Sequence, residues 1–304
     1  MPESCVGRTD ARLLGANGAH STGVPLLRLP GTPGCRYSGL RVERSGWQER
    51  RLRLILTERP GFGASSRLPG RGFIEPADDL ISILDHLGLE KVHALGGSGG
   101  APHVLALAAR HPDRVRAATV VVGAAPLAEE ETATLIGANA ESHRLIHSGD
   151  FEGFRRHLEQ LAAALEDPIP GMLHLMREAP EADRVVMRDP DWQAAFAMAM
   201  RESLRPSVEG WFDEGIALET RGDEINLDEI VTSLTWWHAP GDANAPLSAV
   251  QRLLKRVPHA RLALFRAHEG HLAPYHRESE ILDELLTRGW EESRDQSVAS
   301  SPTR

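Results

Sequence analysis

The sequence is poor in cysteine, with only Cys5 and Cys35 among its 304 residues. Two cysteines this far apart provide neither the ligand spacing of a zinc site nor a disulfide framework. We therefore expect no metal site and no structural disulfide. The scarcity of cysteine also favours a reducing, cytoplasmic environment.

Long apolar runs and basic clusters are missing as well. No apolar segment approaches the ~20 residues of a membrane-spanning helix, and the N-terminus lacks the charged-then-apolar pattern of a signal peptide. Acidic residues outnumber basic ones by 43 to 34, and the densest basic stretch is only Arg50-Arg51-x-Arg53. A nucleic-acid surface needs more positive charge than this. We expect a small-molecule substrate, no nucleic-acid partner and no membrane span, and the sequence leaves the oligomeric state open.

The chain is rich in alternating strand and helix patterns. Hydrophobic residues make up 41% of the sequence, enough for a full core. Apolar and β-branched runs predict strands, and apolar residues at helical spacing predict helices between them. The strands are expected at 11–14, 24–29, 52–56, 92–95, 115–123, 232–238 and 261–265, and the helices include 76–87, 104–109, 247–256 and 275–290. This alternation predicts an α/β fold with a mostly parallel central sheet flanked by helices.

The alternation stops between 127 and 229. Here the chain is divided into short helical segments by Pro168, Pro170, Pro180 and Pro190. We predict a helical cap or lid here, inserted between the two parts of a core domain, 1–126 and 230–290. An ordinary run of peripheral helices is the alternative. Residues 291–304 are polar and are expected to form a disordered tail. Large apolar residues of the insertion are expected in its core rather than in a pocket: Trp192, Phe196, Met198, Met200 and Trp211.

One stretch, Leu95-Gly-Gly-Ser-Gly-Gly-Ala-Pro102, places a single serine among four glycines between a strand and a helix. Gly96-x-Ser98-x-Gly100 is the G-x-S-x-G nucleophile elbow, a strained turn that lifts the serine hydroxyl above the sheet edge. A P-loop pattern is absent, and Pro102 replaces the third glycine of a dinucleotide fingerprint, so no nucleotide cofactor is expected. A purely structural turn is the remaining alternative.

Three polar residues follow predicted strands in the chain order Ser98, Asp242, His271. In this respect the chain resembles the α/β-hydrolase fold superfamily, and the resemblance covers roughly 24–290. Five matches carry it: Pro30-Gly-Thr-Pro-Gly34 in place of the family's His-Gly-x-Pro loop, Arg59-Pro-Gly-Phe-Gly63, the Ser98 elbow, Asp242-x-Asn-x-Pro246 and Gly270-His-Leu272.

The resemblance implies a catalytic triad. Ser98 is a weak nucleophile at neutral pH, and His271 would accept its proton and later protonate the leaving group. Asp242 would orient the imidazole and stabilise its charged form. The oxyanion would be bound by the backbone N–H of Gly99 and by that of Thr32. The expected function is a serine hydrolase of esters, thioesters or amides, carboxylesterase-like or aminopeptidase-like, that needs no cofactor.

Alternatives remain at several positions. His268 is close to His271 but lies outside the Gly-His-Leu match, and His238 lies in an apolar strand, where a core role is favoured. His103 is expected to pack or to line the pocket, and Cys35 is expected to be a small buried residue. Epoxide hydrolases and haloalkane dehalogenases of this fold use aspartate at the elbow, so the serine argues against both. Carbon–carbon hydrolysis and acyl transfer stay open. So does a non-hydrolytic ligand-binding protein, which Pro30 favours because the family has histidine there.

Overall fold

The structure is a computed structural model that describes residues 3–6, 11–15, 23–38, 45–133, 135, 137–242 and 244–299. Within these residues one eight-stranded sheet has the order β1-β2-β4-β3-β5-β6-β7-β8. Its strands are β1 Glu3–Val6, β2 Ala11–Gly15, β3 Val24–Leu29, β4 Leu52–Thr57, β5 Val92–Gly97, β6 Val115–Val121, β7 Leu234–His238 and β8 Arg261–Leu264.

The six strands from β4 to β8 in this order are all parallel. The other two, β1 and β2, extend one edge of the sheet in antiparallel pairing. Continuous β-branched and aliphatic runs such as that of β6 are typical of strands buried on both faces. The mostly parallel sheet flanked by helices confirms the predicted fold class.

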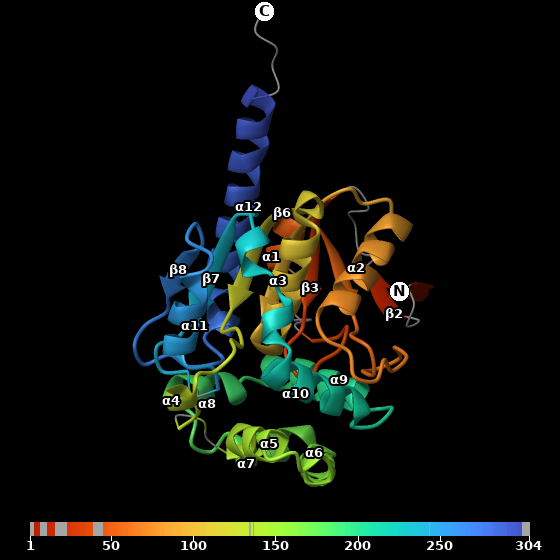
Figure 1. The fold of residues 1–304 in the computed structure, drawn as a ribbon, viewed down its shortest axis with the longest axis vertical. Coiled ribbons are helices and arrows are strands. Elements are labelled where there is room, and N and C mark those ends of the chain that lie inside the picture. Colours follow the sequence, from red (N-terminus) through yellow and green to blue (C-terminus); the bar gives the residue numbers. More distant parts are fainter. Residues whose placement is uncertain are drawn as a thin grey trace, which may run out of the picture.

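Helices cover both faces of the sheet (Figure 1). On one face lie α2 Ile74–His86, α3 Ala101–Arg110 and α11 Leu247–Leu254, which share a core cluster with Leu27, Ile55 and Trp236 of the strands. On the other lie α1 Ser45–Glu49 and α12 Pro274–Ala299, which pack on Leu26, Leu54 and Trp237. Strand neighbours such as Leu26 and Leu27 enter opposite clusters because successive side chains of a strand alternate between its faces.

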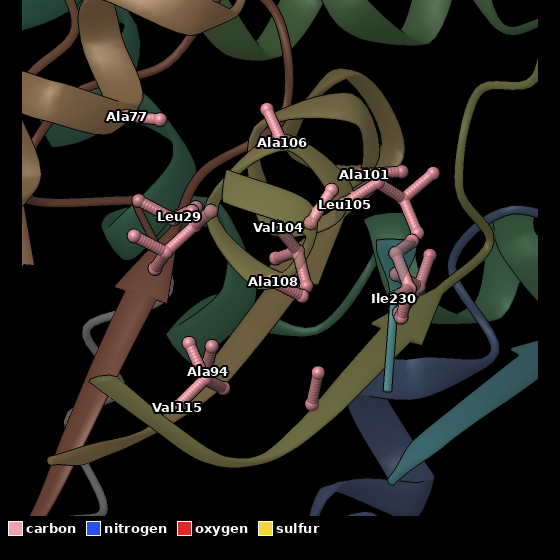
Figure 2. Close-up of a cluster of buried hydrophobic side chains, with 14 of the residues drawn as sticks. Leu29, Ala77, Ala94, Ala101, Val104, Leu105, Ala106, Ala108, Val115 and Ile230 are labelled. Atoms are coloured by element: carbon pink, nitrogen blue, oxygen red, sulfur yellow. The ribbon is translucent and has the colours of Figure 1, made fainter. Parts of the chain in front are cut away.

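Helix α3 is the centre of the first cluster (Figure 2). Its small residues, among them Ala101, Ala106 and Ala108, are almost completely buried and belong to the same cluster as Leu29 and Ala94 of the neighbouring strands. Small side chains let the helix axis approach the sheet closely. This close packing holds the N-terminus of α3 directly behind the β5–α3 turn.

Seven helices separate β6 from β7: α4 Glu129–Thr132, α5 Gly137–His147, α6 Phe151–Ala164, α7 Pro168–Leu175, α8 Glu181–Met187, α9 Pro190–Ser203 and α10 Glu209–Thr220. We call α4–α10 the inserted helices. Figure 1 shows α5, α6 and α7 as a layer beyond one end of the sheet. They carry a core of their own, in which Phe154 stacks on Phe212 at 5.4 Å between ring centroids. Among the described residues, no helix is long and apolar enough to cross a membrane.

The structure differs from the sequence predictions at both ends of the chain. Strand β1 lies before 11–14, the first strand that the sequence predicts. It forms because it pairs with β2, a tertiary contact that a short pattern does not reveal. Helix α12 continues to Ala299, whereas a disordered tail was expected from 291. This stretch has no proline before Pro302, and several of its residues have good helix propensity. Residues 300–304 lie outside the described residues.

Candidate active site

All the predicted site residues follow strands at the carboxyl edge of the parallel sheet. Thr32 follows β3, Ser98 follows β5, Asp242 follows β7 and His271 follows β8. Parallel strands bring the loops after their carboxyl ends together, and this is where open α/β sheets place their ligands. Ser98 and His271 line one cavity, together with Thr32 and Gly99.

The turn at Ser98 has the strain that its sequence predicts. Ser98 has φ of 50°, a left-handed conformation that non-glycine residues adopt rarely. A Cβ on Gly96 would lie 2.5 Å from a methyl of Val104 and 2.8 Å from the carbonyl oxygen of Gly100. Only glycine therefore allows the strand to enter the turn this closely. A single 3₁₀ turn, Ser98–Gly100, then leads into α3.

Asp242 and His271 form a direct hydrogen bond, 2.8 Å from Nδ1 of the imidazole to Oδ2 of the carboxylate. The Asp242 side chain is fully buried, and its other oxygen accepts bonds from the backbone N–H groups of Asn244 and Ala245 at 2.8 and 3.2 Å. These three bonds set the orientation of the carboxylate. The imidazole is thereby left with Nε2 as its free nitrogen.

Electrostatics in this pair favour a charged imidazole. Burial alone would lower the pKa of His271, but the Asp242 carboxylate outweighs it and raises the pKa above the ordinary value of 6.5. Burial would raise the pKa of Asp242, yet the imidazole and the backbone donors lower it. Asp242 therefore stays ionised at neutral pH. Such a pair can accept a proton at Nε2 and hold it.

Thr32 and Gly99 lie against each other. A Cβ on Gly99 would be 3.3 Å from the backbone nitrogen of Thr32 and 2.2 Å from its Oγ1. On the other side, a Cβ on Gly31 would be 3.7 Å from the hydroxyl oxygen of Ser98. Thr32, Ser98 and Gly99 therefore lie close together at the wall of one cavity.

A buried ion network supports the Pro30–Gly34 loop. The guanidinium of Arg59 donates to the carbonyls of Pro30 and Gly31 and, at 2.9 Å, to the hydroxyl of Thr32. Its Nε lies 2.9 Å from Oε1 of Glu214 in α10, which also accepts from the Thr32 hydroxyl at 3.2 Å. The Pro30–Gly34 loop is thus held by Arg59 and Glu214, two charged residues that are almost completely buried.

Glu214 has two further partners. Arg71 donates to its second oxygen, and Nε2 of His103 lies 3.0 Å from the first. Burial would raise the pKa of Glu214, but the guanidinium groups of Arg59 and Arg71 outweigh it and hold that pKa well below its usual range. Burial lowers the pKa of His103 to about 4. Of this network, sequence analysis singled out Arg59 in the Arg-Pro-Gly-Phe-Gly match and His103 as a packing residue, and no local pattern indicated Glu214 or Arg71.

A second carboxylate from the inserted helices supports the His271 loop. Asp183 of α8 is 1% exposed and accepts the backbone N–H of Leu272 at 3.0 Å. A Cβ on Gly270 would lie 2.4 Å from its carboxylate. Burial raises the pKa of Asp183, and its negative charge helps to raise that of His271. No local pattern in the sequence signalled this residue.

The cavity at Ser98 has a volume of about 280 Å³. Much of its apolar wall comes from the inserted helices, including Ile146, Met172 and Trp211. A second cavity of about 450 Å³ shares Met172 and Trp211 with the first and is also lined by Phe196 and Met200. Three of the apolar residues expected in the core, Phe196, Met200 and Trp211, line a cavity and also belong to or pack against a core cluster. Trp192 stacks on Phe196 at 4.8 Å, and Met198 is 41% exposed.

The alternative candidates lie elsewhere. His268 is exposed. His238 is fully buried and bonds the carbonyl of Ala245 at 2.9 Å, as expected of a core histidine. Cys35 is 1% exposed and donates to the carbonyl of Ala199.

Comparison with known proteins finds one family model, described as alpha/beta hydrolase fold, that matches residues 24–201. A 2-hydroxymuconate semialdehyde hydrolase of Pseudomonas putida is 25% identical over 80% of this chain and 79% of its own length. Haloalkane dehalogenase 2 of Mycobacterium bovis is 35% identical over 34% of this chain and 35% of its own. An uncharacterized Bacillus subtilis hydrolase, YcgS, aligns at 33% identity over 22% of this chain and 24% of its own. The chain thus spans about a quarter to a third of the length of these two locally matching relatives.

Solved structures resemble the whole fold. An esterase of Thermogutta terrifontis superposes with a TM-score of 0.64 at 20% identity, over 95% of this chain and 98% of the other. An enol-lactonase of Burkholderia xenovorans superposes with a TM-score of 0.66 at 17% identity, over 94% and 100%. At these identities the likeness concerns the fold.

Proposed function

Since the chain belongs to the alpha/beta hydrolase fold family, we propose that it is a serine hydrolase that forms an acyl-enzyme on Ser98. The observation that carries this proposal is the 2.8 Å hydrogen bond between His271 and Asp242 beside the cavity that Ser98 also lines. A serine at a strained elbow, a histidine with one nitrogen engaged and a buried carboxylate are the parts that acyl transfer needs.

In the proposed mechanism, the Ser98 oxygen attacks the substrate carbonyl carbon while Nε2 of His271 takes the hydroxyl proton. The resulting oxyanion accepts hydrogen bonds from the N–H groups of Gly99 and Thr32. His271 then gives its proton to the leaving alcohol, thiol or amine as the bond to the carbonyl carbon breaks. Water, deprotonated by the same imidazole, then attacks the acyl carbon. The bond from this carbon to the Ser98 oxygen breaks, the oxygen takes the proton back from His271, and the carboxylic acid leaves.

The Arg59–Glu214 network supports hydrolysis over mere ligand binding. Pro30 stands where the family has histidine, which raises the question of what shapes the oxyanion loop. Arg59 bonds the carbonyls of Pro30 and Gly31 and the hydroxyl of Thr32, and Glu214 bonds that hydroxyl as well. A loop held at three successive residues from a buried network can keep its N–H groups aimed without the histidine.

The proposed substrates are small neutral acyl compounds. Among the described residues that line the Ser98 cavity there is no arginine or lysine, and Glu219 contributes a carboxylate. Such a lining favours uncharged acyl groups over anionic ones. Apolar residues of the inserted helices form much of the wall, so we propose that these helices act as a cap that selects the acyl group. Dehalogenation, suggested by one local relative, is disfavoured because Ser98 stands where the dehalogenases of this fold use aspartate.

The test is covalent labelling with a fluorophosphonate, read as intact mass. The wild type should gain one adduct and Ser98→Ala none, whereas Ser82→Ala, at an exposed position of α2, should label like the wild type. Failure of a folded wild type to react with both a long and a small organophosphorus reagent would contradict the proposal. Ester turnover should follow the same pattern, with neutral butyrate esters cleaved faster than succinate monoesters.

A further inference from the structure

Two histidines and a glutamate from different helices meet at the edge of the inserted helices. His143 and His147 lie one turn apart on α5, with ring centroids 4.2 Å from each other. Glu219 of α10 reaches both, with Oε2 2.8 Å from Nδ1 of His143 and 3.3 Å from Nε2 of His147. One ligand atom from each of the three residues lies within 4.8 Å of the other two.

We propose that His143, His147 and Glu219 bind one divalent transition-metal ion of the Zn²⁺ class. Two imidazoles and one carboxylate form a ligand set used by zinc sites that keep an open fourth position. Histidines at i and i+4 share one face of a helix, so they can approach one ion together. Imidazole ligands select Zn²⁺ and its neighbours over Mg²⁺ and Ca²⁺, which prefer oxygen.

The surroundings leave these ligands available. Within the described part of the chain, Glu219 pairs with these two histidines, whereas the nearby Arg144 pairs with Glu141 at 2.6 Å. His143 and Glu219 are about one-fifth exposed, and His147 is half-exposed, so an ion can enter from solvent. Small rotamer changes bring the three atoms to metal-ligand distances, since they already lie within 4.8 Å.

The site lies at the cavity that Ser98 lines. Glu219 is part of the cavity wall, as are Ser142 and Ile146, which flank His143 and His147 on α5. An ion bound here would cross-link α5 to α10 and place a positive charge at the rim of a cavity whose described lining has no arginine or lysine. The metal site is inferred from its own ligands and does not rest on hydrolase activity.

The test is calorimetric titration of the full, chelator-treated chain with Zn²⁺. We expect one saturable site. Removing a residue that only hydrogen-bonds to a metal ligand typically lowers metal affinity by about 10- to 100-fold. Removing a ligand itself, in His143→Ala or His147→Ala, should therefore weaken Zn²⁺ binding by at least about 100-fold. Glu219→Gln keeps the side-chain volume and should weaken it as well. His86→Ala, at an exposed position of α2, should bind like the wild type.

A variant of the Ser98 site shows whether metal binding is independent of that site. His271→Ala should retain the Zn²⁺ site, since it removes an imidazole of the triad and none of the proposed ligands. Zn²⁺ should also raise the melting temperature of the wild type and not that of the folded His143→Ala/His147→Ala double variant. Absence of saturable binding, binding that survives both histidine substitutions, or binding lost in His271→Ala would each overturn the proposal.

Discussion

Helix α10 carries two glutamates with different surroundings. Glu214 is fully buried between Arg59, Arg71 and His103, whereas Glu219 is about one-fifth exposed and faces two histidines of α5. Five residues of an α-helix turn through about 140° from one face to another, so one carboxylate points to the sheet edge and the other to a neighbouring helix. The same residue type thus meets two guanidinium groups at one position and two imidazoles at the other.

The carboxylates of the inserted helices differ in what they bind. Arg59 and Arg71 balance the charge of Glu214, and Arg59 also holds the Pro30–Gly34 loop. Asp183 is similar, because it is buried and holds the His271 loop by a backbone bond. Within the described residues, Glu219 is bonded by the two imidazoles of α5 rather than by a guanidinium. Buried carboxylates of the inserted helices therefore organise the sheet edge, while the one at the rim can take a ligand.

The largest expected effect is on folding stability. Glu214→Ala leaves two guanidinium groups buried without their partner, and loss of one member of a buried ion pair costs about 3–5 kcal/mol of unfolding free energy. Glu219→Ala, measured without metal, should cost less than about 1 kcal/mol, as partly exposed pairs do. Urea denaturation of both variants measures the difference. Equal losses of unfolding free energy in the two variants would contradict this difference between Glu214 and Glu219.

The next effect is on turnover. Glu214→Gln keeps the volume but removes the charge that orients Arg59 and the Thr32 hydroxyl, so we expect kcat to fall by roughly 10- to 100-fold, less than loss of an oxyanion donor costs. KM should change little, because the cavity wall is untouched. Glu141→Gln, an exposed position paired with Arg144, is the control and should keep wild-type kcat. A normal kcat in a folded Glu214→Gln variant would contradict the support role.

Lowering the pH should reduce folding stability through Glu214 and His103 of the same network. The pKa of Glu214 is lowered in the folded state, so its contribution to stability is complete above the ordinary glutamate pKa of about 4.5 and is lost as pH falls through the folded value. His103 has a folded pKa of about 4 against an ordinary 6.5, so it removes stability as pH falls from 6.5 to 4. In His103→Gln, the unfolding free energy should therefore decline less over that interval. If the unfolding free energy of His103→Gln fell with pH as steeply as that of the wild type, this role of His103 would be contradicted.

The smallest effect concerns Asp183 and the pH–rate profile. His271 must be neutral to accept the Ser98 proton, so kcat/KM should fall as pH drops below its raised pKa. Asp183→Asn removes one of the charges that raise this pKa. We therefore expect the acid limb of the profile to move to lower pH, by less than about one unit. Movement to higher pH, or none in a folded variant, would show that Asp183 does not act on the imidazole.

Much of the fold could be predicted from local patterns. Strands β3 to β8 and helices α2, α3 and α11 lie close to their predicted ranges because their apolar periodicity is strong. The Ser98 elbow was predictable as well, since only glycine fits at Gly96 and the pattern is short. Strand β1 and helix α1 were missed. Both are short elements whose existence depends on what they pack against.

The candidate site was only partly predictable. The triad order and Thr32 came from motifs, but Glu214 and Asp183 belong to helices whose sequence carries no sign of the loops they touch. His143-x-x-x-His147 has helical ligand spacing, yet its third partner lies far along the chain. Distant carboxylates can be matched with their partners only once the helices are placed in space.

By itself, the sequence determined the alternation of strands and helices, the strained serine turn and the order of the three polar residues after the strands, because each depends on neighbours within a few positions. Only the tertiary structure decided which carboxylates of the inserted helices are buried against Arg59 and His271 and which one remains at the rim. Burial and charge pairing depend on the packing of elements far apart in the chain, and no local pattern encodes that packing.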